Sequence, residues 1–90
     1  MQASLAHSAS AQSNLAALPQ NSLGYVTGFA APDHDIETRL REIGFAEGDE
    51  VEPLHYGLVR KNPMVVRLNG ALIALRRKEA SYILVSTEKG

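Results

Sequence analysis

The sequence has no cysteine, no long apolar run and only two phenylalanines and three tyrosines among its 90 residues. The missing cysteine excludes disulfides, a thiolate nucleophile and every cysteine-based zinc or iron–sulfur site. No stretch approaches the roughly 20 apolar residues of a membrane-spanning helix. So few aromatic residues disfavour base stacking on single-stranded nucleic acid. A small chain without covalent staples rests on a single core, which favours a binding or accessory module over a stand-alone enzyme.

An excess of either charge is also absent, because nine Lys and Arg face ten Asp and Glu, for a net charge of -1. This balance argues against a protein whose role is to neutralise phosphates, so we expect no nucleic acid partner. The charges are unevenly distributed: residues 1–52 carry eight acids and two bases, whereas residues 53–90 carry two acids and seven bases. In a small fold these halves give either a mixed surface or two faces of opposite sign that orient the protein on a charged partner.

Residues 1–12 are rich in Ala, Ser and Gln and contain no Lys, Arg, Asp or Glu. They offer little apolar surface to offset the entropy of ordering, so we expect a flexible tail ahead of one domain at residues 13–90. A short helical peptide that docks on a partner is the alternative. The segment lacks the basic start and the continuous apolar stretch of a signal peptide. We therefore expect a cytoplasmic protein without direct membrane insertion.

Residues 35–43 carry the pattern of an amphipathic helix. Ile36, Leu40 and Ile43 fall on one apolar stripe, and Asp35 is expected to be the N-cap. Gly44 stands where a helix ends with positive φ, and Phe45 then contacts Leu40 in a Schellman motif.

The remainder favours short β-strands at residues 24–30, 49–55, 64–68, 71–77 and 82–86. Pro53 suits an edge or a bulge, and Asn69-Gly70 indicates a two-residue hairpin turn. Residues 57–63 are expected to be a loop, residues 78–81 a short turn or helical step, and residues 71–77, apolar on both faces, a central covered strand. The expected core consists of Ile36, Leu40, Ile43, Val51, Val66, Leu68, Ile73, Leu75, Ile83 and Val85. About five strands with one short α-helix predict a mainly β fold, a small closed barrel.

Two stretches resemble the FeoA family. The first runs from Arg39 to Gly48 (RLREIGFAEG) and is similar to that family's RL-x-x-hG-h-x-x-G element. The second comprises residues 63–70 (PMVVRLNG), residues 73–80 (IALRRKEA) and residues 83–85 (ILV), and is similar to its closing signature. The family usually has a glycine at the turn that follows Leu18-Pro19-Gln20, which we call the entry turn. This chain has Asn21 there, and asparagine also tolerates positive φ.

The resemblance implies an SH3-like barrel and a small cytoplasmic partner of a FeoB-type ferrous iron transporter, which carries its own GTPase domain. The same fold also occurs as the C-terminal domain of iron-dependent repressors of the diphtheria-toxin-repressor type. Such repressors carry helix-turn-helix and metal-binding domains ahead of it. We expect the free-standing form here, and an SH3-like regulatory or metal-sensing module remains the alternative.

Sites for chemistry are scarce. The glycines match neither a P-loop nor a dinucleotide-binding pattern, so we expect turns and no phosphate site. The most ligand-like cluster is Asp33-His34-Asp35, which a helix cap explains as well as a metal does. No nucleophile–base pair is evident. The sequence therefore predicts no enzyme, no cofactor and no tight metal site, but a protein that acts by docking.

The expected docking surface is the stretch from Tyr56 to Lys61. Its apolar side chains have no periodic place in the expected core, and basic residues flank them. Arg39 and the basic run at residues 76–78 are expected to form an electrostatic rim. The candidate partner-binding residues are Tyr56, Leu58, Val59, Arg60, Lys61, Arg39 and Arg76. A second copy of the chain is an alternative occupant.

Overall fold

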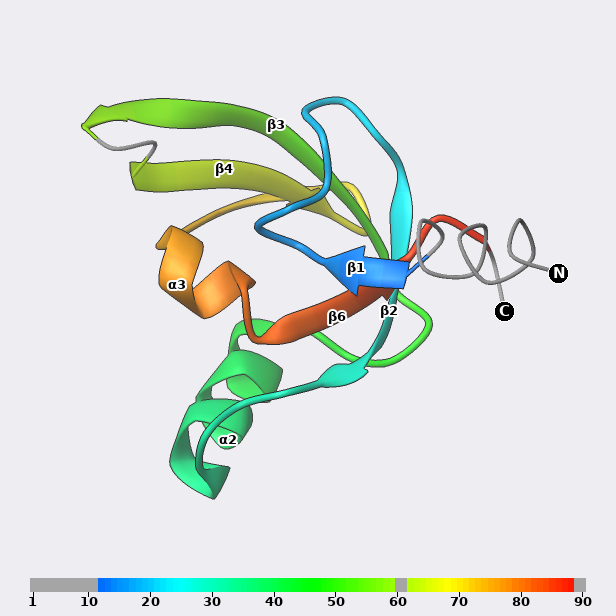
Figure 1. Ribbon diagram of the computed structural model, residues 1–90, viewed down its shortest axis with the longest axis vertical. Helices are drawn as coiled ribbons and strands as arrows, with labels where there is room; N and C mark the ends of the chain where they lie inside the picture. Colours follow the sequence, from blue (N-terminus) through cyan, green and yellow to red (C-terminus); the bar gives the residue numbers. More distant parts are fainter. Residues whose placement is uncertain (1–11, 60–61, 89–90) are drawn as a thin grey trace, which may run out of the picture.

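The computed structural model describes residues 12–59 and 62–88, which form one six-stranded antiparallel sheet and two helices (Figure 1). The spatial order of the strands is β1-β6-β2-β3-β4-β5. The elements are β1 (Gln12–Asn14), β2 (Gly24–Phe29), α2 (His34–Ile43), β3 (Glu50–Val59), β4 (Asn62–Leu68), β5 (Ala71–Leu75), α3 (Arg77–Ala80) and β6 (Ile83–Ser86). The expected tail lies outside the described residues, except for Gln12, which begins β1.

The mainly β prediction is confirmed, with one strand more than expected and with helix α3 where a short turn or helical step was expected. The additional strand, β1, pairs with β6 through Gln12↔Ser86 and Asn14↔Leu84. The sheet is open, with β1 and β5 as its two edges. The expectation of a central, covered strand at residues 71–77 is therefore wrong: β5 pairs with β4 alone among the described strands.

The two turns that need positive φ are formed as the sequence predicts. Asn69 and Gly70 have φ of 49° and 90°, which matches the type I′ turn that joins β4 to β5. Asn21 adopts φ of 68°, and its backbone N–H donates to the carbonyl of Pro53. Asparagine thus replaces glycine at the entry turn without loss of the turn.

Strand β3 is longer than expected. Its pairing with β4 shifts register between Pro53 and His55, so the bulge anticipated at Pro53 is present. The ladder then continues through Tyr56↔Met64 to Val59↔Asn62 after a second irregularity. The loop expected at residues 57–63 is therefore wrong, because β3 continues to Val59 and β4 begins at Asn62.

Helix α2 begins one residue earlier than the pattern predicts, and its N-cap lies two residues earlier. The side chain of Asp33 accepts a hydrogen bond of 3.0 Å from the backbone N–H of Ile36, so Asp33 is the N-cap in place of Asp35. Gly44 ends the helix with φ of 132°, and the N–H groups of Gly44 and Phe45 donate to the carbonyls of Arg41 and Leu40. These are the two bonds of a Schellman motif.

The core is drawn from nearly the whole described chain. Phe45 and Leu40 are both buried in the core, whereas Ile43, expected inside, is 39% exposed at the last position of α2. Ile36 and Ile73 pack only partly against the core. The buried apolar residues are Leu15, Leu18, Val26, Leu40, Phe45, Val51, Met64, Val66, Leu68, Leu75, Ala80, Ile83 and Val85. Leu15 and Leu18 were not expected, because they precede β2 in a segment without strand or helix periodicity.

Candidate docking groove

Helices α2 and α3 lie near one another, at the left of Figure 1, although residues 44–76 separate them in the sequence. A groove of about 220 Å³ lies between them. Its lining comes from both helices and from the residue that precedes β6: Ile36, Arg39, Leu40, Arg76, Lys78, Glu79 and Tyr82. The groove exists because α3 follows β5 directly and turns the chain back past α2 before β6 begins.

Three apolar side chains form the floor of the groove. Leu40 is buried, and Ile36 and Tyr82 are half-buried and pack on the core. The floor is thus the outward continuation of the hydrophobic core. An apolar concave surface that is left partly open is what a partner's side chain can fill.

The rim is mostly cationic. The lining contains three basic residues and one acid: Arg39, Arg76, Lys78 and Glu79. Arg76 and Lys78 form no ion pair with a described acid, whereas Nη2 of Arg39 lies 3.6 Å from Oε2 of Glu79. The side chain of Arg39 is nonetheless 73% exposed, so this pair leaves its charge available to a partner.

Glu79 contacts both sides of the groove. Its Oε1 accepts a hydrogen bond of 3.0 Å from the backbone N–H of Arg76, at the start of α3, while its Oε2 faces Arg39 on α2. A carboxylate at this position satisfies a free N–H group at the start of the helix and complements its dipole. The only acid of the rim is thus committed to structure, and the groove keeps a net positive character.

The other arginine of α2 is not free to bind a partner. Arg41 forms a bidentate pair with Glu47, at 3.0 and 2.9 Å, and a further bond of 3.0 Å with Glu37. Its guanidinium also lies 4.5 Å from the centroid of the Phe29 ring. The hydrogen bonds from Arg41 lower the pKa of Glu47 to about 2, and those same bonds raise the pKa of Arg41. This network links α2 to the turn that follows it.

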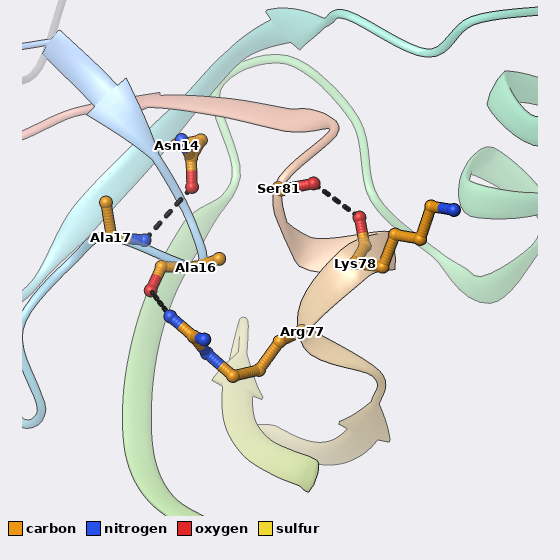
Figure 2. Close-up of a pocket in the computed structure, with 6 residues that line it drawn as sticks. All are labelled: Asn14, Ala16, Ala17, Arg77, Lys78 and Ser81. Atoms are coloured by element: carbon orange, nitrogen blue, oxygen red, sulfur yellow. Dashed lines mark hydrogen bonds between the residues drawn. The ribbon is translucent and has the colours of Figure 1, made fainter. Parts of the chain in front are cut away.

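A second hollow, of about 360 Å³, lies between α3 and the residues that follow β1, and polar and apolar groups both line it (Figure 2). Its polar groups are mostly engaged with one another. Asn14 Oδ1 accepts from the N–H of Ala17 at 3.0 Å, Ser81 Oγ donates to the carbonyl of Lys78, and Arg77 Nη2 reaches the carbonyl of Ala16 at 3.4 Å. The Lys78 side chain points away from Arg77 in this view. Nε of Arg77 is buried there without a hydrogen-bond partner among the described residues.

The structure brings together only part of the expected docking surface. Arg39 and Arg76 both line the groove, from opposite walls. The backbone of Tyr56, Leu58 and Val59 belongs to β3, but their side chains, together with Arg60 and Lys61, lie outside the described residues. The sequence reasoning missed Ile36, Leu40 and Tyr82 as a floor, because it assigned the first two to the core and the third to a strand.

The Asp33-His34-Asp35 cluster is engaged at the start of α2. Asp33 caps α2, and Nε2 of His34 lies 3.3 Å from the hydroxyl of Thr38. Within residues 12–59 and 62–88, no group of three or more His, Asp or Glu side chains is placed to hold a metal ion. Weak iron binding by the isolated protein stays a prediction.

Comparison with known proteins relates the fold to one family. The FeoA domain profile matches residues 13–87. Among curated proteins, no match was found. Similar solved structures include two FeoA proteins. The FeoA protein of Chlorobium tepidum is 30% identical, with a TM-score of 0.69, over 81% of this chain and 68% of that one. The FeoA of Stenotrophomonas maltophilia, solved with zinc, is 31% identical, with a TM-score of 0.72, over 84% of this chain and 92% of that one.

The Stenotrophomonas protein is described as a prokaryotic SH3 domain protein and a candidate activating factor of bacterial ferrous iron transport. The SH3-like prediction is confirmed by this likeness. A manganese-dependent transcriptional repressor also shares the fold, with a TM-score of 0.71 but 18% identity, over 83% of this chain and 41% of that one. At that identity the likeness concerns the fold alone. No helix in the described part of the chain is long and apolar enough to cross a membrane.

Proposed function

The chain belongs to the FeoA family, which relates it to ferrous iron transport, and on this premise we propose that it docks on a FeoB-type transporter at its cytoplasmic side and regulates it. Catalysis has no part in this proposal. The protein acts by binding one state of the transporter more tightly than another, which shifts the population toward that state.

The observation that carries the proposal is the groove between α2 and α3. It combines an apolar floor, continuous with the core, with three basic residues at the rim and one acid already used in structure. Fully buried apolar anchors supply most of the energy of a protein interface, and charged rims mainly set orientation and association rate. The groove is therefore suited to an apolar side chain flanked by acidic residues.

Binding of the transporter, reconstituted in nanodiscs, tests the proposal. Arg39→Ala and Arg76→Ala remove exposed charges from the rim, so we expect an unchanged melting temperature and binding weakened by about tenfold for the double variant. Arg67→Ala is the matched control, because Arg67 also pairs with one acid, Glu52 at 2.9 Å, but lies outside the groove. If the control weakens binding as much as the double variant, or if the double variant binds normally, the groove is not the docking surface.

The outer end of the β3–β4 hairpin is the second candidate surface for the same function. Tyr56, Leu58, Val59, Arg60 and Lys61 were expected there from the sequence, and their side chains lie outside the described residues. The variant Leu58→Asp distinguishes an interface role of Leu58 from a role in the core. Retained stability with weakened transporter binding supports an interface at the hairpin, whereas a large loss of stability means that Leu58 packs inside the fold.

A regulatory or metal-sensing module with a different partner is the alternative function. The fold shared with the manganese-dependent repressor favours it, but only at the level of architecture. A gene for a GTPase-containing transporter beside the gene of this protein supports the transporter role. Failure to bind that transporter under any condition supports the alternative.

A further inference from the structure

Strand β5 combines an edge position with an apolar sequence. It reads Ala71-Leu72-Ile73-Ala74-Leu75, without a charged residue or a proline, and it lies at one end of the sheet. Leu72 is 65% exposed, the most of any large apolar residue in the described chain. Natural edge strands are usually protected by charge, proline or shortness. The opposite edge, β1, is short and polar, so β5 is the unprotected one.

The outer side of β5 carries backbone N–H and C=O groups that can pair with another strand. In a hairpin with a two-residue turn, the flanking residues Leu68 and Ala71 exchange hydrogen bonds, and the bonded pairs then alternate along the ladder. Ile73 and Leu75 consequently bond to β4, while the N–H and C=O groups of Leu72 and Ala74 point away from it. No strand of the described chain pairs with them.

We propose that β5 pairs with β5 of a second copy of this chain, antiparallel, about a two-fold axis at Ile73. In this register Leu72 of each copy lies opposite Ala74 of the other, and the pair exchanges two backbone hydrogen bonds on each side of the axis. A large side chain then faces a small one across the junction. The sheet continues from one copy into the next, and the exposed Leu72 becomes covered.

The charges near the strand are compatible with self-pairing. The nearest charged residue along the chain is Arg76, directly after β5, in an extended conformation with φ of -77° and ψ of 149°. In the proposed register Arg76 lies beside the Asn69-Gly70 turn of the second copy. The two copies of Arg76 are then about 20 Å apart, at roughly 3.4 Å per residue. That separation exceeds the Debye length of about 8 Å at physiological salt, so their repulsion is screened.

The size of the contact limits its strength. Five paired residues bury much less than the roughly 1,200 Å² of a stable interface. Association is therefore weak and depends on concentration. A self-complementary uncharged strand favours a second copy over a charged peptide, because a charged peptide would offer no apolar side chain to cover Leu72. This inference does not rest on the proposed transporter role, because β5 contributes no residue to the groove between α2 and α3.

Sedimentation equilibrium across a wide range of protein concentration tests the proposal. We expect a reversible monomer–dimer equilibrium for the parent. Leu72→Lys places a charge at the junction and raises the dimer dissociation constant by at least about tenfold. Leu23→Lys is the matched control, because Leu23 is also an exposed leucine, at 45%, but lies outside the strands. Melting curves establish that both variants fold.

The register has its own readout. In a mixture of isotope-labelled and unlabelled protein, intermolecular nuclear Overhauser effects between Leu72 and Ala74 support the pairing. At high concentration, the amides of Leu72 and Ala74 also gain protection from hydrogen exchange. A parent that stays monomeric throughout, a Leu23→Lys variant that dissociates equally, or contacts between other residues would overturn the proposal.

Discussion

At the scale of single residues, a substitution at Gly44 tests backbone strain without a change in packing. Its φ of 132° is a conformation that side chains rarely adopt, yet a Cβ there would meet only Cδ2 of Leu68, at an ordinary 3.5 Å. We expect Gly44→Ala to lower the free energy of unfolding by roughly 1–2 kcal/mol, through the backbone alone. Gly28→Ala is the control, because the nearest atom to its Cβ, Cδ1 of Leu84, is 4.0 Å away and its φ is ordinary. Equal melting temperatures for Gly44→Ala and Gly28→Ala would contradict backbone strain at position 44.

The carboxylate of Glu47 gives the protein an acid-dependent contact. Hydrogen bonds from Arg41 lower its pKa from an ordinary 4.5 to about 2. A depressed pKa in the folded state adds stability that is complete above the unfolded pKa and is lost as pH falls through the folded value. The contribution of Glu47 is therefore expected to disappear between about pH 4.5 and pH 2. Because the pair is at the surface, salt weakens it.

Glu47→Gln isolates this contribution. The variant should be less stable than the parent near pH 7, and the difference should close as the pH approaches 2. Urea unfolding at a series of pH values measures the difference, and NMR titration of the Glu47 carboxyl gives its pKa directly. A difference that stays constant with pH would mean that Arg41 does not hold the carboxylate in solution.

Among the elements, the start of α2 distinguishes two candidate caps. Asp33 accepts the N–H of Ile36, whereas Asp35 lies within the first turn and has only a favourable interaction with the helix dipole. Asp33→Ala is expected to cost about 1 kcal/mol of unfolding free energy, and Asp35→Ala no more than about half of that. Chemical denaturation of both variants measures the difference. A larger loss for Asp35→Ala would restore it as the cap.

The same elements show what local sequence determines. The end of α2 followed from Gly44 and Phe45, and the β4–β5 turn from Asn69-Gly70, because both depend on the φ preferences of single residues. The position of β5 did not follow, since an apolar pattern on both faces is shared by a covered strand and an unprotected edge. Nor could periodicity place Arg39 beside Arg76, because that proximity arises from the path of the whole chain.

For the molecule as a whole, the segment before β2 is part of the core. Leu15 is 0% exposed, and its N–H donates to the carbonyl of Ile83 at 2.9 Å, while Leu18 is also buried. The segment thus connects edge strand β1 to the centre of the fold. A domain of this size has a small margin of stability, toward the low end of the usual 5–15 kcal/mol. Loss of one central side chain therefore threatens the entire molecule.

Alanine variants of two leucines, eight positions apart, test how far the stability of the protein depends on the segment before β2. Leu15→Ala leaves a cavity in the core and is expected to cost about 2–5 kcal/mol, enough to unfold a large fraction of the protein at 37 °C. Leu23→Ala removes a side chain that is 45% exposed and is expected to cost less than about 1 kcal/mol. Urea unfolding followed by circular dichroism compares the midpoints. Similar midpoints for the two variants would mean that residues before β2 only lie against the fold. A large gap between them would establish that the segment before β2 is part of the core, as the burial of Leu15 indicates.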